Sequence, residues 1–169
     1  YKRQKADRAV TFIENLRHIK GKWAGKRFWL LPWQEQIIRD VFGIVDEKGN
    51  RQFRTAYVEI GKKNGKSLLA SGVGLYLQTA DGEAGPEVYA VATKRDQAKI
   101  IWQEAKRMVK KSPALCRRMR SLVAELDSDF NDGVFKPLAS DSDTLDGLNI
   151  HGAMMDEIHQ WKSGRALYD

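Results

Sequence analysis

The sequence predicts an α/β fold in which a mostly parallel sheet is flanked by helices, with an N-terminal helical lead-in. The main observation is that β-rich segments alternate with segments of helical periodicity after residue 54. A second is the glycine-containing turn that joins the first of these strands to the next helix. The expected strands are 54–60, 87–92, 121–126, 133–138 and 151–156, of which 121–126 and 133–138 are the weaker candidates.

Helices are expected on either side of the first two strands. Residues 5–19 place Val10, Ile13 and Leu16 on one face, and residues 33–43 form an amphipathic helix that stops at Gly43. Two more helices follow the strands 54–60 and 87–92. Their apolar positions recur at helical spacing: Leu68, Leu69, Gly72, Leu75 and Tyr76 in one, and Ala98, Ile101, Trp102, Ala105, Met108 and Val109 in the other.

Length and composition bound the possible functions. With 169 residues, 42% of them hydrophobic, the chain suffices for one domain over residues 1–169, and its start at Tyr1 suggests a piece of a longer protein. A single cysteine, Cys116, excludes an internal disulfide and a multi-cysteine zinc site, and favours a reducing, intracellular compartment. No run approaches the roughly 18 apolar residues of a membrane span, so no membrane association is expected.

The charge distribution favours a polyanionic partner such as nucleic acid or nucleotide. The formal net charge is +7. Residues 94–120 carry ten basic side chains against Asp96 and Glu104, whereas residues 127–157 carry eight acidic side chains against Lys136. A solvated helix face would explain the basic block equally well.

The turn at residues 61–67 has the composition of a phosphate-binding loop. Gly61, Lys62, Lys63, Asn64, Gly65, Lys66 and Ser67 lie between an expected strand and an expected helix, where backbone N–H groups and a helix N-terminus can face phosphate. Lys66 would reach the β- and γ-phosphates of ATP, and the Ser67 hydroxyl would hold Mg²⁺. The first glycine stands one residue late, because the usual position is occupied by Ile60. The alternative is a basic turn that only caps the helix.

A pair of carboxylates at the end of the last expected strand completes this pattern. A nucleotide-bound Mg²⁺ requires a carboxylate near the Ser67 hydroxyl, and Asp156 suits that role. Glu157 would orient and polarise the attacking water. An apolar strand that merely exits on two acidic residues would look the same. Upstream, Trp33 and Gln34 are candidates to border adenine, because an amide can both donate to and accept from the base edge; a helix start with a core tryptophan is the alternative.

Taken together, these motifs resemble the N-terminal ATPase region of large terminase subunits from tailed bacteriophages and prophages. The resemblance covers roughly residues 28–161 and rests on their order: Pro32-Trp33-Gln34, the 61–67 loop, residues 92–98, Gly147-Leu148-Asn149, and Asp156-Glu157-Ile158-His159. It implies an additional-strand P-loop ATPase that hydrolyses ATP with Mg²⁺ and drives double-stranded DNA through a portal into the prohead. It also implies a homo-oligomeric ring, a small terminase subunit as partner, a location in the bacterial host cytoplasm, and a nuclease domain that lies C-terminal to this region and is absent here.

Two positions depart from the family pattern. Lys62 stands where the phosphate loop of the family often begins with arginine, and lysine keeps the charge but loses the bidentate fork. Asp146 stands where some members have an arginine that acts across the subunit boundary. Arg95, or an arginine beyond residue 169, would have to replace it.

Two other functions remain open from the sequence. A P-loop DNA or RNA helicase lobe shares the upstream glutamine, the loop and the Asp-Glu strand, but such helicases usually continue into Ala-Asp or Ala-His rather than Ile158-His159. A non-catalytic DNA-binding module would use the basic helix and keep the loop only as structure. Its DNA binding would ignore ATP and survive loss of Lys66.

Overall fold

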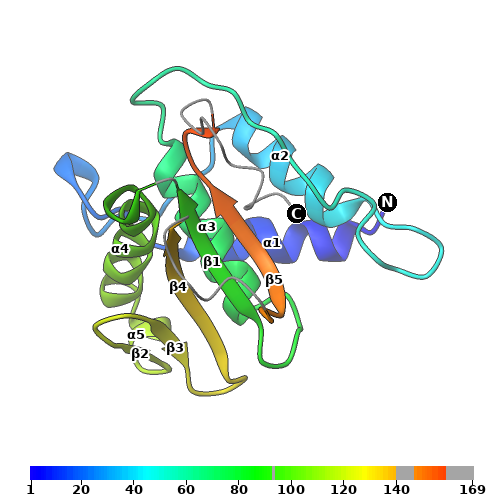
Figure 1. The fold of residues 1–169 in the computed structure, drawn as a ribbon. Coiled ribbons are helices and arrows are strands. Elements are labelled where there is room, and N and C mark those ends of the chain that lie inside the picture. The colour runs from blue at the N-terminus through cyan, green and yellow to red at the C-terminus, as the bar shows by residue number, and fades with distance from the viewer. Residues whose placement is uncertain (93, 140–146, 159–169) are drawn as a thin grey trace.

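The computed structural model describes residues 1–92, 94–139 and 147–158. Their elements alternate in the way an α/β domain requires (Figure 1). In chain order they are α1 (Arg3–Asn15), η1 (Gly21–Trp23), α2 (Pro32–Gly43), α3 (Lys66–Thr79), β1 (Glu87–Ala92), α4 (Arg95–Lys111), α5 (Pro113–Cys116), β2 (Met119–Ser121), β3 (Leu126–Ser128), β4 (Gly133–Ala139) and β5 (Ile150–Met155). Within these residues no helix is long and apolar enough to cross a membrane.

One sheet of five strands, in the order β2-β3-β4-β1-β5, forms the centre of the fold. The strands β4, β1 and β5 are parallel, and a register shift between Glu87 and Val88 interrupts the β1–β5 pairing. Helices α3 and α4 both contact the sheet and each other, so they share one face of it. Helices α1 and α2 pack together, and α1 also contacts α3, which adds a further layer of helices (Figure 1). The predicted α/β class, with helices flanking the sheet, is confirmed.

The core lies between α3, α4 and the three parallel strands. Val88, Leu75, Met108 and Phe135 are fully or almost fully buried there. Helix α3 comes close to β4 at Gly74, where an added Cβ would lie 2.7 Å from two ring atoms of Phe135. A glycine here lets the helix that follows the 61–67 loop sit close against the sheet. This contact helps to set the position of α3, and so of its N-terminus, against the sheet.

The predicted strand 54–60 is wrong. These residues carry no strand assignment, and most of them are exposed. A β-rich sequence becomes a strand only when a neighbour completes its hydrogen-bond ladder. The available edge of the sheet is β5, yet residues 54–60 and β5 line the same cavity instead of pairing. The segment therefore approaches α3 as irregular chain.

The region before β4 also differs from the prediction. Residues 121–126 were expected as one strand, but residues 122–125 form the turn of a short antiparallel hairpin between β2 and β3, and Val123 at its tip is 96% exposed. Close connections of this length can join only antiparallel strands. The expected helix 5–19 ends at Asn15, because the chain turns there into an extended segment that pairs Arg17 with Arg27.

Candidate functional site

The 61–67 loop forms a concave turn at the N-terminus of α3. Lys63 and Gly65 have left-handed backbone conformations, with φ of 67° and 78°. The Asn64 side-chain amide closes the turn by donating to the Gly61 carbonyl at 3.0 Å. Gly65 is the N-cap of α3, and the first N–H groups of a helix have no intrahelical acceptor. Such a turn directs backbone donors and the positive end of a helix toward one point, which is an arrangement that binds anions.

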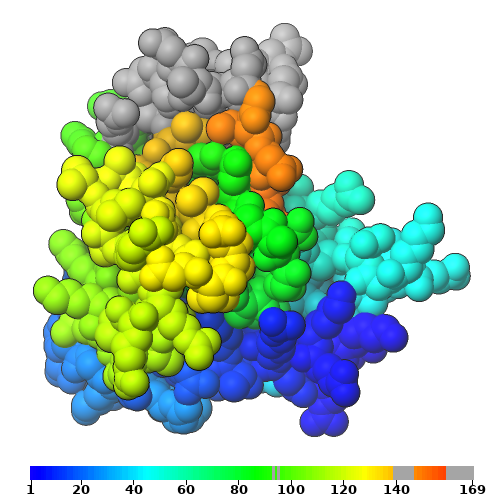
Figure 2. Space-filling model, turned by 90° about the horizontal axis from the view of Figure 1, so that it is seen from below, coloured from blue at the N-terminus to red at the C-terminus, as the bar shows by residue number. Residues whose placement is uncertain are grey.

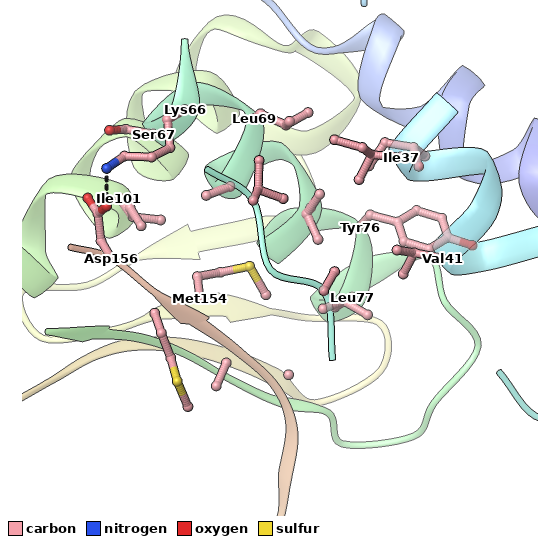
Figure 3. A pocket seen from close by; sticks show the side chains of 18 of the residues that line it. Ile37, Val41, Lys66, Ser67, Leu69, Tyr76, Leu77, Ile101, Met154 and Asp156 are labelled. Atoms are coloured by element: carbon pink, nitrogen blue, oxygen red, sulfur yellow. Dashed lines mark ion pairs between the residues drawn. The ribbon is translucent and has the colours of Figure 1, made fainter. Parts of the chain in front are cut away.

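An ion pair joins the loop to the end of the sheet. Lys66 Nζ lies 2.7 Å from Asp156 Oδ1, and the Lys66 side chain is 41% exposed, whereas that of Asp156 is 13% exposed. Asp156 immediately follows β5 and donates its backbone N–H to the Val91 carbonyl at 3.1 Å, which fixes it beside β1. Figure 3 shows Lys66, Ser67 and Asp156 gathered at one end of a cavity. The two motifs are about 90 residues apart in the chain and meet here in space.

Glu157 adopts a strained conformation that aims its side chain at α4. Its φ is 50°, in the left-handed region that costs a non-glycine residue about 1–2 kcal/mol. Its backbone N–H donates to Asp156 Oδ1 at 2.9 Å, and its carboxylate Oε2 accepts a hydrogen bond from Gln97 Nε2 at 3.1 Å. Strained residues of this kind persist where the surroundings hold them, often at functional sites. Gln97 lies in the first turn of α4, directly after β1.

These groups border a cavity of about 1630 Å³. Its walls include the 61–67 loop, one side of α3, part of α2, β5 and residues 53–60. One end carries Lys66 and Asp156, and apolar side chains such as Leu69, Leu77 and Met154 line part of the remainder (Figure 3). This volume exceeds the roughly 300–1000 Å³ of typical small-molecule sites, so a nucleotide has room in it.

The donor atoms at the polar end suit Mg²⁺ bound together with a phosphate ligand. Mg²⁺ in nucleotide sites is held by one or two protein oxygens, with water and phosphate oxygens completing the octahedron. Ser67 and Asp156 offer one hydroxyl and one carboxylate. Within the described residues no group of three or more histidine, cysteine or acidic side chains is placed to hold a metal by itself. The chemistry therefore fits a metal that arrives with the nucleotide.

Other predicted site residues lie apart from this cluster or outside the described chain. Gln34 is buried and its Oε1 accepts the Leu31 N–H at 2.9 Å, while its Nε2 lies 3.7 Å from where a Cβ on Gly65 would be. Trp33 packs against the hydrophobic core, and neither residue lines the cavity, so their contact with adenine stays a prediction. Lys62 is exposed at the cavity wall. The side chain of Arg95, together with residues Asp146 and His159, falls outside what the structure describes.

Sequence reasoning assigned no role to two features of the site. Gln97 belongs to the quoted segment 92–98, but only the fold shows that its amide meets Glu157. At the other end of the cavity, Asp81 accepts from Arg51 at 2.7 Å and contacts His151 Nε2 at 2.8 Å. Burial raises the pKa of Asp81, but the hydrogen bond from His151 and the positive charge of Arg51 outweigh it, so the net pKa lies below the ordinary value. No sequence spacing connects these three residues.

Comparison with known proteins gives concordant results. Residues 32–168 match the family described as "Terminase large subunit, ATPase domain". The large terminase subunit of Enterobacteria phage HK97 is 26% identical over 167 residues, which cover 92% of this chain and 31% of the phage protein. The crystal structure of the HK97 bacteriophage large terminase superposes with a TM-score of 0.79 at 25% identity, over 92% of this chain and 32% of that one. The chain thus spans about a third of the length of this relative.

Proposed function

Since this chain belongs to the family of terminase large-subunit ATPase domains, we propose that it binds and hydrolyses ATP at the cavity between the 61–67 loop and Asp156. The observation that carries this proposal is the Lys66–Asp156 ion pair of 2.7 Å. It brings the lysine proposed to bind phosphate and the carboxylate proposed to bind the metal within reach of one ligand. A loop that only capped α3 would not require a carboxylate from another strand at that point.

In this proposal, ATP binding exchanges the partners of the ion pair. Lys66 and the N–H groups of residues 61–67 would contact the β- and γ-phosphates, and Asp156 and Ser67 would hold the metal. Bound Mg²⁺ would supply positive charge to the phosphate oxygens as the bond to the leaving group breaks. Glu157 orients the attacking water and accepts its proton, and Gln97 holds the Glu157 carboxylate in position. A cationic side chain from a neighbouring subunit would contribute further, because an arginine finger is worth about 10³–10⁵ in rate.

The ATPase is proposed to drive double-stranded DNA as part of a larger protein. Family membership favours a packaging motor over the helicase lobe and over the non-catalytic DNA-binding module. We infer a homo-oligomeric ring that acts in the cytoplasm of the bacterial host, on the portal of the prohead, together with a small terminase subunit. The basic surface of the chain, with a formal net charge of +7, suits a polyanionic substrate.

Two substitutions test the site. Lys66→Ala removes the charge that meets the phosphates, so we expect the affinity for a fluorescent ATP analogue with Mg²⁺ to fall by tenfold or more, since about 1.4 kcal/mol corresponds to tenfold. Glu157→Gln keeps the size of the side chain but not its ability to accept a proton, so analogue binding should persist while turnover falls by about 10²–10⁴-fold.

Matched controls come from the exposed turn at residues 46–50. Lys48→Ala and Glu47→Gln remove the same kinds of charge from side chains that do not line the cavity, and should leave binding and turnover unchanged. If Lys66→Ala bound the analogue as tightly as Lys48→Ala, the loop would not be the phosphate site. Normal hydrolysis by Glu157→Gln would remove Glu157 from the mechanism.

A further inference from the structure

A hairpin on the N-terminal side of the region that matches the ATPase family has the features of a surface that binds nucleic acid. Residues 17–29, here called the basic hairpin, precede the matched region that begins at residue 32. They contain five lysines and arginines and no acidic residue. Every residue from 20 to 27 is exposed, as is Trp29, which is 62% exposed. So much charge and aromatic surface on a short segment contributes little to the core of this chain.

The hairpin is built to hold this surface outward. Its two arms pair through the Arg17–Arg27 bridge, and His18 and Lys26 are joined by a backbone hydrogen bond of 2.9 Å. At the tip, Gly21 and Gly25 have φ of 64° and 82°, and an added Cβ on either would meet no atom within 4 Å. The base is anchored by buried apolar side chains that belong to the hydrophobic core: Leu16, Ile19, Phe28 and Leu30. The tip is therefore a defined turn that projects into solvent.

The exposed tryptophans organise the cations around them. The ammonium groups of Lys22 and Lys26 lie 5.3 and 5.1 Å from the centre of the Trp23 ring. The Arg27 guanidinium lies 5.3 Å from that of Trp29. Such contacts are worth about 0.5–1 kcal/mol at exposed sites and restrict the flexible side chains. Less conformational entropy is then lost when these cations meet an external anion.

Most of the positive charges of the basic hairpin have no acidic partner within the described part of the chain. Of the five cations, Lys20 alone has a carboxylate within 4.0 Å there, that of Glu104 on α4 at 3.0 Å. This ion pair joins the hairpin to α4, whose exposed positions include Arg107, Lys110 and Lys111. Figures 1 and 2 both show the hairpin beside α4 along one edge of the molecule. The hairpin therefore extends a surface that is already basic.

We propose that the basic hairpin contacts the sugar–phosphate backbone of the double-stranded DNA that this ATPase moves. The assignment rests on the proposed function for the identity of the DNA, and on the hairpin itself for the contact. Lysine and arginine pair with phosphates, and the indole N–H of each tryptophan can donate to phosphate oxygen. Contacts to phosphate carry no sequence information, so a hairpin that binds through them reads no sequence. A motor that must pass any sequence requires this kind of contact.

The test compares the salt dependence of DNA binding for two double variants of the full chain. Lys22→Ala with Lys26→Ala removes two charges from the tip, and Lys2→Ala with Lys48→Ala removes two exposed charges from segments on the opposite side of the molecule (Figure 1). A plot of log affinity against log salt has a negative slope, and each lost phosphate contact makes this slope less steep by about 0.9. Between about 50 and 200 mM salt, the affinity of the unchanged chain for a short fluorescent duplex should fall about 12-fold more than that of the hairpin variant.

The control variant should keep the slope of the unchanged chain. Equal slopes for all three proteins would overturn the proposal. Loss of self-association by the hairpin variant, with DNA affinity unchanged, would assign the hairpin to a protein interface and overturn it as well. ATP hydrolysis without DNA is measured on the same samples. If no protein hydrolyses ATP yet the slopes differ as expected, the proposed function fails while the DNA contact stands; hydrolysis with equal slopes means the reverse.

Discussion

The hydrogen bond between Gln97 and Glu157 offers the sharpest test of how the site works. Glu157 sits in a left-handed conformation at φ 50°, and the Gln97 amide holds the far end of its side chain at 3.1 Å. Replacing Gln97 by leucine keeps a side chain of similar size but removes the donor. The Glu157 carboxylate then loses the contact that orients it, whereas Lys66 and Ser67 are untouched.

The expected magnitude follows from the charge of the acceptor. A hydrogen bond to an ionised group contributes about 1.5–3 kcal/mol, and each 1.36 kcal/mol is tenfold in rate. Full loss would correspond to roughly 13- to 160-fold in turnover. Both side chains are partly exposed, so water compensates part of the loss. We therefore expect Gln97→Leu to lower kcat by about tenfold.

Steady-state ATP hydrolysis and analogue binding together separate positioning from structure. If Gln97 acts through Glu157, kcat falls while KM and the affinity for the ATP analogue stay unchanged. Gln103→Leu on the exposed side of the same helix is the matched control and should leave all three quantities unchanged. In a Glu157→Gln background, Gln97→Leu should have no further effect on turnover. An equal loss in that background, or a rise in KM with unchanged kcat, would refute the positioning role.

Two further predictions concern stability, measured by denaturant unfolding. Gly74→Ala places a methyl group 2.7 Å from the buried ring of Phe135, so an overpacking cost of about 1–3 kcal/mol should outweigh the gain of about 1 kcal/mol in helix propensity. In a Phe135→Leu background the loss of stability should be smaller. A Gly74→Ala protein that is more stable than the unchanged chain would contradict this packing. Because the pKa of Asp81 is depressed, its stabilising contribution should be present above the unfolded-state value of 3.8 and lost as pH falls below it. Asp81→Asn should therefore lower the free energy of unfolding by about 1.5–3 kcal/mol at pH 7. The loss should become progressively smaller below pH 4, because Arg51 and His151 then lose their charged acceptor. A loss that does not vary with pH would exclude this linkage.

Elements whose signal is local were predicted well. Helix α2 begins at Pro32 and ends at Gly43, as its proline and glycine indicate, and α3 begins at Lys66 within the predicted loop. The strands β1, β4 and β5 lie within one residue of the predicted ranges. Periodicity, proline and glycine act over a few residues, so they can be read without knowing the fold.

Elements that depend on a partner were predicted poorly. Residues 54–60 have the composition of a strand, but no strand in the described chain pairs with them. Residues 121–126 also have a strand-like composition, but the antiparallel pairing of Met119 with Ser128 places a turn at their centre. Strand propensity reports a fit to a half-buried surface, and only the assembled sheet decides where that surface is available.

By itself the sequence determined the α/β class, the helix that follows the 61–67 loop, and the candidate site residues Lys66, Ser67, Asp156 and Glu157, because each depends on residue type and local spacing. Tertiary structure alone decided that Lys66 meets Asp156, that Gln97 meets Glu157, and that Arg51, Asp81 and His151 form one cluster. Those contacts join residues 30 to 90 positions apart. Only the packing of α3 and α4 against a common sheet brings such distant side chains within hydrogen-bonding distance.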